Sequence, residues 1–135
     1  IADSGVSFST AEAVAGVRSR WLSSPAAYQG HFESIARLTG EVEHLLEIGV
    51  PQQIGPLLTQ NHRILAEMGV SSPRLDELVD TAIKAGALGA KLSGGGIGGN
   101  VIALVNTEVI DQVVTSLETR GTARTLVVTI PSTME

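Results

Sequence analysis

Apolar residues recur at helical spacing through most of the first 86 residues. The first series begins at Ser9-Thr10-Ala11-Glu12, a capping box in which the serine hydroxyl and the glutamate carboxylate satisfy free N–H groups. In each later stretch of helical spacing, a proline stands in the first turn and a glycine stands at the end. This pattern predicts helices over residues 9–22, 25–49, 51–69 and 72–86.

The pattern changes in the second half of the chain, where short apolar runs rich in branched side chains replace the helical spacing. Runs at 87–93 and 101–105 flank a glycine loop, a fifth helix is expected over 106–121, and a last strand over 124–130 ends at Pro131. The first five residues resemble the end of a strand. The order indicates an α+β fold with an antiparallel sheet and helices packed on one face, compatible with a ferredoxin-like arrangement.

The loop Gly94-Gly95-Gly96-Ile97-Gly98-Gly99 holds more glycine than a hairpin turn requires. A stretch without side chains lets main-chain N–H groups approach a bulky, anionic group, and we favour this interpretation over a flexible linker. The spacing Gly94-x-Gly96-x-x-Gly99 matches a dinucleotide fingerprint, but that fingerprint requires a following helix, and a strand follows here. No Gly-Lys-Ser or Gly-Lys-Thr sequence ends the loop, so a Walker-type loop is excluded.

Few other residues suggest chemistry. Lys91 and Ser93 are two apart on a strand, so they share a face beside the loop and could meet an anion with it; an exposed strand charge is the alternative for Lys91. Thr10 stands at a helix start, where it either assists the cap or directs its hydroxyl at a ligand. Asp76, with Glu77 and Asp80, is expected on a solvated helix face. The candidate phosphate-loop residues are Lys91, Ser93, Gly94, Gly95, Gly96, Gly98 and Gly99.

Composition narrows the classes of partner. The chain has 135 residues, which suits a single domain over 1–135, and a net charge of −5 without any basic run, so nucleic acid and membrane surfaces are poor partners. There is no cysteine, which excludes disulfides and thiolate sites and fits a cytoplasmic protein. The three histidines lie far apart and are expected at helix surfaces or interfaces, with no metal site.

Three segments together resemble a known family. Residues 91–100 resemble the third signature, Lys-Leu-Thr-Gly-Ala-Gly-Gly-Gly-Gly-Cys, of the galactokinase, homoserine kinase, mevalonate kinase and phosphomevalonate kinase superfamily. Residues 9–20 are similar to the Thr-x-x-x-Val-x-x-Val-Arg segment of mevalonate kinases, and residues 61–78 to a further run of that family. Four positions of the signature depart from it, namely Ser93, Gly95, Ile97 and Asn100. Ile97 puts a branched side chain into a loop suited to close backbone approach.

The resemblance implies the carboxy-terminal domain of an ATP-dependent kinase that converts mevalonate to 5-phosphomevalonate in isoprenoid synthesis. ATP and Mg²⁺ would be bound mainly by an amino-terminal domain absent here, which also carries the catalytic Asp and Lys, so the isolated domain is expected to be inactive. By motif position, Thr10 and the backbone near Gly95 would contact mevalonate, and Gly94 to Gly99 would border the phosphates. An exposed apolar face is expected where the absent domain docks.

Two other interpretations stay open from the sequence. One is another kinase of the superfamily, acting on phosphomevalonate, homoserine or a sugar. The other is a non-catalytic ferredoxin-like module that binds a small ligand or mediates assembly. A homodimer is also left open.

Overall fold

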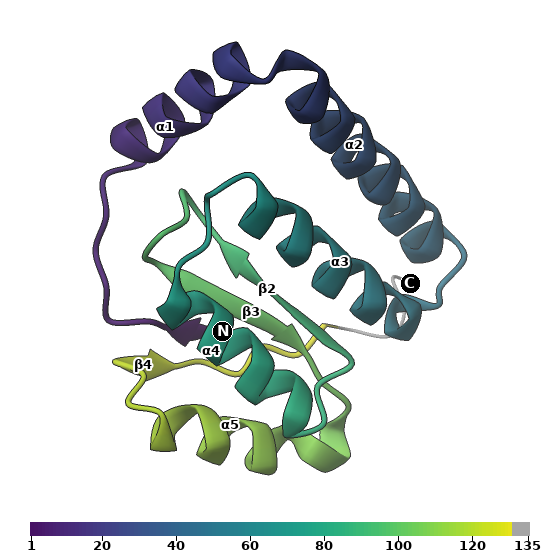
Figure 1. The fold of residues 1–135 in the computed structure, drawn as a ribbon. Coiled ribbons are helices and arrows are strands. Elements are labelled where there is room, and N and C mark those ends of the chain that lie inside the picture. The colour runs from purple at the N-terminus through teal and green to yellow at the C-terminus, as the bar shows by residue number, and fades with distance from the viewer. Residues whose placement is uncertain (131–135) are drawn as a thin grey trace.

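The computed structural model describes residues 1–130, in which helices surround a small sheet (Figure 1). In chain order the elements are β1 (Ala2–Asp3), α1 (Thr10–Ser23), α2 (Pro25–Glu47), a 3-10 turn (Pro51–Gln53), α3 (Ile54–Glu67), α4 (Pro73–Lys84), β2 (Gly89–Ser93), β3 (Asn100–Leu104), a second 3-10 turn (Thr107–Val109), α5 (Ile110–Thr119) and β4 (Arg124–Thr125). This order confirms the predicted sequence of elements and the α+β class.

The four strands form one antiparallel sheet in the order β2-β3-β1-β4. β2 and β3 are a hairpin whose register runs from Gly89 opposite Leu104 to Ser93 opposite Asn100. β1 lies between β3 and β4, with Ala2 opposite both Val101 and Thr125. Helices connect β1 to β2 and β3 to β4, and in the sheet each of these pairs is separated by one antiparallel strand. This is the ferredoxin-like topology with which the sequence is compatible.

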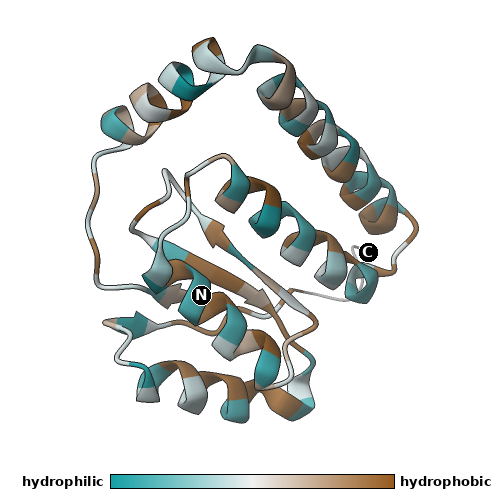
Figure 2. Cartoon of the chain, viewed as in Figure 1, coloured by the Kyte–Doolittle hydropathy of each residue, from teal (hydrophilic) through white to brown (hydrophobic). Residues whose placement is uncertain are grey.

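The main core lies between one face of the sheet and helices α4 and α5. Leu75 and Leu78 of α4 are 0% exposed, and they pack with Leu92 and Val101, which are cross-strand partners on the sheet. Both helices carry apolar and polar residues (Figure 2), and all of their buried residues are apolar. The apolar spacing of the fourth predicted helix therefore places its buried face correctly.

Helix α3 runs along the free edge of β2 instead of lying over the sheet face. The N–H of Ala90 donates to Thr59 Oγ1 at 3.3 Å, and the N–H of Leu92 donates to His62 Nδ1 at 3.1 Å. These side chains satisfy edge amides that would otherwise be open to pairing with another strand. The approach is close, because a Cβ on Gly89 would lie 1.7 Å from the carbonyl oxygen of Gly55.

Helices α1 and α2 form an outer arm beyond α3 (Figure 1). Tyr28 and Leu38 of α2 are buried with Ile64 and Met68 in a second, smaller core. Helix α1 buries Ala13 alone among its residues. The predicted cap of α1 is present, since Ser9 Oγ accepts a hydrogen bond from the Glu12 N–H at 3.4 Å.

The predicted boundaries of the last strand and of two helices are wrong. The last strand was expected over 124–130, but β4 ends at Thr125, after which only Leu126 bonds to the chain start, donating its N–H to the Ile1 carbonyl at 2.8 Å. Residues 127–130 have no neighbouring strand because β1 begins at Ala2; Pro131, the predicted end, lies outside the described residues. The third and fifth helices each start with a 3-10 turn, so their α-helical parts begin at Ile54 and Ile110.

The sheet face opposite the main core carries an exposed apolar surface, as expected. Its cavity of about 440 Å³ has walls from Ile102 and Leu104 and from the segment after β4, where Val128 and Ile130 are 62% and 67% exposed. That another domain docks there stays a prediction. Among the helices of residues 1–130, none combines the length and apolarity needed to cross a bilayer.

Candidate functional site

The glycine loop between β2 and β3 follows a path that side chains would obstruct. Gly94, Gly96 and Gly99 have positive φ angles of 100°, 86° and 87°. A Cβ on Gly96 would lie 2.2 Å from the Val70 carbonyl oxygen, and one on Gly98 would lie 2.4 Å from that of Val6. Conformation therefore favours glycine at Gly94, Gly96 and Gly99, and the closeness of neighbouring backbone requires it at Gly96 and Gly98.

Ile97 is the exception in this loop, because it occupies the left-handed region with φ of 61°. A branched residue is strained there, and the strain is held by its N–H, which donates to the Val70 carbonyl at 2.8 Å. The Gly99 N–H donates to the Val6 carbonyl at 2.9 Å, and the Gly99 carbonyl accepts from the Ser4 N–H at 2.9 Å. The second half of the loop is thus fixed to two other segments of the chain.

The first half of the loop has its amides free. Among residues 1–130, the N–H groups of Gly94, Gly95 and Gly96 have no hydrogen-bond acceptor, whereas those of Ile97, Gly98 and Gly99 are bonded within the chain. Gly94 and Gly95 are exposed to solvent. Successive main-chain N–H groups in a turn form a concavity suited to an anion. The half of the loop next to β2 is therefore the part that can receive a ligand.

Thr10 meets this free half of the loop. It is the first residue of α1, and a Cβ built on Gly95 would lie 2.8 Å from its Oγ1. Thr10 and the loop glycines line an open hollow of about 640 Å³, together with Ser93 and residues of the segment between β1 and α1. The structure thus brings together Thr10, Ser93, Gly94, Gly95, Gly96, Gly98 and Gly99, all of them candidates from the sequence.

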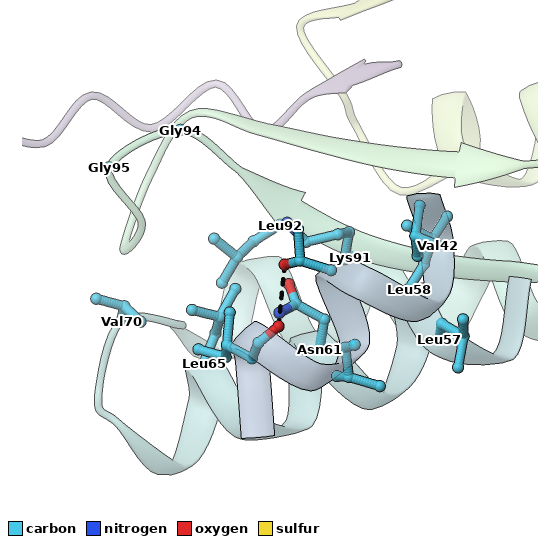
Figure 3. A pocket seen from close by; sticks show the side chains of 13 residues that line it. Val42, Leu57, Leu58, Asn61, Leu65, Val70, Lys91, Leu92, Gly94 and Gly95 are labelled. Atoms are coloured by element: carbon cyan, nitrogen blue, oxygen red, sulfur yellow. Dashed lines mark hydrogen bonds between the residues drawn. The ribbon is translucent and has the colours of Figure 1, made fainter. Parts of the chain in front are cut away.

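Lys91 lies in a different hollow. Its side chain lines a second cavity of about 440 Å³ between α2, α3 and β2, where Asn61 and several leucines are its neighbours (Figure 3). Gly94 and Gly95 line both hollows and form the boundary between them. Burial lowers the pKa of the Lys91 ammonium, because the charged form loses part of its hydration. Lys91 and Ser93 therefore share a strand face but not a cavity.

Replacing Lys91 with methionine is expected to stabilise the domain at neutral pH. The folded-state pKa of Lys91 is below the unfolded value of 10.5, so the charged form carries a cost in the folded protein. That cost is fully present below the folded pKa and declines as the pH rises from the folded pKa to the unfolded value of 10.5. Urea unfolding of both proteins should give Lys91→Met the higher midpoint at pH 7, with the gap narrowing toward pH 10.5; a gap that stays constant or widens would contradict this.

Arg20 is a residue that the sequence did not identify as important. Its Nε donates to the Met68 carbonyl at 3.0 Å and to Tyr28 Oη at 3.0 Å, while Tyr28 Oη donates to the same carbonyl at 2.8 Å. Gly69 leaves room for the guanidinium, since a Cβ there would lie 2.9 Å from Arg20 Cζ. We call these hydrogen bonds of Arg20 and Tyr28 to the Met68 carbonyl the Arg20 clamp. The clamp joins α1 to the end of α3, two residues before the Val70 carbonyl that bonds to the glycine loop. The helix that begins at Thr10 and the loop that contains Gly95 are thus both held to the segment at the end of α3.

Removing this clamp should loosen α1 more than the rest of the domain. In Arg20→Ala, the arm loses hydrogen bonds to a charged group, each worth about 1.5–3 kcal/mol. Helix α1 buries Ala13 alone, and its other packing contacts come from the partly buried Val17 and from Trp21 against Phe32, so the clamp is a large share of what holds it. Hydrogen exchange of the α1 amides should accelerate at least about tenfold while that of α4 is unchanged. The matched control is Arg18→Ala on the same helix; equal acceleration in both variants would show that the clamp does not position α1.

His62 is buried at the junction of α3, α4 and β2. Because its Nδ1 accepts the Leu92 N–H, its Nε2 carries the proton and donates to Asp76 Oδ1 at 2.9 Å. Ser71 Oγ donates to the same oxygen at 2.5 Å. His62 therefore lies at an interface, as expected, and holds β2 where it enters the glycine loop. Asp76 is exposed, as predicted, but it also has this partner.

The site can position an anion and a hydroxyl group, but its residues offer little acid–base chemistry. The free amides supply donors without a proton to transfer, and Thr10 supplies a neutral hydroxyl. No group of three or more His, Asp or Glu side chains that could hold a metal is found within residues 1–130. The arrangement therefore fits one wall of a binding cleft for an anionic substrate or a phosphate.

Comparisons with known proteins agree with this description. A family model described as "GHMP kinases C terminal" matches residues 42–123. The mevalonate kinase of Pyrococcus abyssi is 38% identical over 105 residues, which cover 74% of this chain and 31% of that protein. The galactokinase of Streptomyces coelicolor is 44% identical over 75 residues, covering 55% of this chain and 19% of that protein.

A solved structure is also similar. The L. major mevalonate kinase in complex with R-mevalonate matches with a TM-score of 0.83 and 29% identity, over 87% of this chain and 36% of that one. The chain thus spans about a third or less of the length of these two curated relatives.

Proposed function

Since the chain belongs to the GHMP kinase family and corresponds to its carboxy-terminal domain, we propose that it forms the substrate-side wall of an ATP-dependent mevalonate kinase. The enzyme would phosphorylate mevalonate to 5-phosphomevalonate in isoprenoid synthesis. ATP with Mg²⁺ would supply the phosphoryl group and would be held mainly by the part of the enzyme outside this chain. The observation that carries the proposal is the set of free amides at Gly94, Gly95 and Gly96 beside the Thr10 hydroxyl.

The chemistry of phosphoryl transfer supports this assignment. Catalysis there rests mostly on positioning and on stabilising charge, which main-chain amides provide without a catalytic base. Thr10 Oγ1 would hold mevalonate by a hydrogen bond, and the Gly94–Gly96 amides would face its carboxylate or the phosphates. The Arg20 clamp and the Val70 contact would keep these two parts in register, so that neither needs to reorganise when substrate binds.

The galactokinase similarity favours a second candidate, a sugar kinase of the same family. Its identity is higher, but it covers 55% of the chain, whereas the mevalonate kinase of Pyrococcus abyssi covers 74%. A substrate panel decides between them, measured on a kinase that contains this chain together with the ATP-binding part, called the longer kinase below. Mevalonate, phosphomevalonate, homoserine and galactose are each tested for ATP-dependent phosphorylation. The proposal predicts the highest kcat/KM for mevalonate; a higher value for galactose would replace it with the sugar kinase.

The purified 135-residue chain is expected to release no measurable ADP from ATP and mevalonate. Its candidate site holds donors that position a ligand but no carboxylate–lysine pair to assist the transfer. A coupled assay for ADP measures this, with the longer kinase as the positive control. Turnover by the isolated chain that depends on mevalonate would contradict the assignment of catalytic groups to another domain.

A further inference from the structure

The cavity that contains Lys91 is separate from the hollow assigned to the substrate. It lies between α2, α3 and β2, on the other side of Gly94 and Gly95 from Thr10. Its volume of about 440 Å³ is within the range of sites for small molecules. The proposed kinase activity uses Thr10 and the loop amides, and it leaves this second cavity without a role.

The lining of this cavity is mostly apolar. Leu38 and Val42 come from α2, and Leu57 and Leu65 come from α3. The polar side chains of the lining are Thr39, Asn61 and Lys91, and Lys91 is the one charged residue among them (Figure 3). Such a surface matches a molecule with a hydrocarbon body and an anionic head.

Lys91 is partly buried without a carboxylate partner among the described residues, since none of the ion pairs found within residues 1–130 includes it. A cation that loses hydration without gaining a partner carries a cost, and the lowered pKa reports this cost. An anionic head seated at the ammonium would offset the lost hydration, while an uncharged head would not.

We propose that the cavity between α2, α3 and β2 is a second ligand site that binds an amphipathic anion. The hydrocarbon body lies against Leu38, Val42, Leu57 and Leu65, and the head, a carboxylate or a phosphate monoester, contacts Lys91 and Asn61. Because Gly94 and Gly95 border both cavities, a ligand bound here changes the position of the main chain that faces the substrate. The proposal does not depend on which substrate the kinase phosphorylates.

The test measures binding of octanoate, octyl phosphate and octanol to the isotopically labelled chain by NMR. The two anions should bind at least about tenfold more tightly than octanol, which has the same body without the charge. Saturating anion should shift the methyl signals of Leu57 and Leu65 and the amide signals of Gly94 and Gly95. Whichever of the two anions binds more tightly identifies the head group.

Two variants make the test specific. Lys91→Met keeps most of the length of the side chain, removes its positive charge, and should make the anions bind no better than octanol. Lys84→Met, at an exposed site on α4, should leave the preference intact. The proposal is overturned if neither anion binds, if octanol binds as tightly as the anions, or if the anions shift the methyl signals of Leu104 and Leu126 on the exposed apolar surface instead.

Discussion

Replacing Gly89 with alanine is expected to lower the free energy of unfolding of the domain by about 3 kcal/mol or more. A Cβ on Gly89 would lie 1.7 Å from the Gly55 carbonyl oxygen, and one on Gly55 would lie 2.4 Å from that of Leu88. Both obstacles are backbone atoms, so no change of side-chain rotamer relieves them. Helix α3 must move away from the β2 edge, which breaks the bonds from Ala90 and Leu92 to Thr59 and His62.

Urea unfolding followed by far-UV circular dichroism measures this effect. Gly40→Ala is the matched control, because Gly40 is exposed in the middle of α2 and no atom lies within 4 Å of a Cβ built there. Alanine is favoured over glycine inside a helix, so the control should be stabilised by about 0.5–1 kcal/mol. A Gly89→Ala protein as stable as the native chain would show that α3 does not pack against β2 this closely.

In the longer kinase, Gly95→Val is expected to lower kcat/KM for mevalonate by about 100-fold with little loss of stability. Gly95 does not have a positive φ, so a side chain there does not force the backbone into a disfavoured conformation. A Cβ would lie 2.8 Å from Thr10 Oγ1, and the two methyl groups of valine beyond it would displace the hydroxyl or the loop amides from their ligand. The effect is therefore expected in catalysis, and the unfolding midpoint should change little. Gly95→Ala is the matched control, because alanine stands at this position of the kinase signature that residues 91–100 resemble, and it should retain most of kcat/KM.

A double-mutant cycle with Thr10→Ala isolates this contact. If Gly95→Val acts by displacing Thr10, the two losses should not add, because the second substitution removes a group that the first has already displaced. Fully additive losses would show that Gly95 and Thr10 act on the substrate independently. A Gly95→Val enzyme with native kcat/KM would exclude any functional contact at this position.

The sequence predicted elements whose cause is local. The capping box at Ser9 places the start of α1, and the apolar spacing of Leu75 and Leu78 identifies the buried face of α4, because each pattern depends on residues within one or two turns. The glycine loop was found for the same reason. Glycine at Gly96 and Gly98 is needed wherever another backbone approaches so closely, although the sequence does not say which one.

Features that depend on distant segments were not predictable. Arg20 contacts the end of α3, which is 48 residues away, and no local pattern distinguishes it from Arg18. The short β4 depends on where its partner β1 begins. Strand alternation correctly put Lys91 and Ser93 on one face, but the path of Gly94 and Gly95 divides that face into two cavities.

The central claim is that the amides of Gly94, Gly95 and Gly96 are left free in order to bind an anion. The most direct test is a crystal structure of the longer kinase with mevalonate and a non-hydrolysable ATP analogue. We predict that at least one of these N–H groups donates to a carboxylate or phosphate oxygen, with Thr10 Oγ1 bonded to the same ligand. A complex in which all three amides face bulk water, or are bonded to protein carbonyls, would contradict the account.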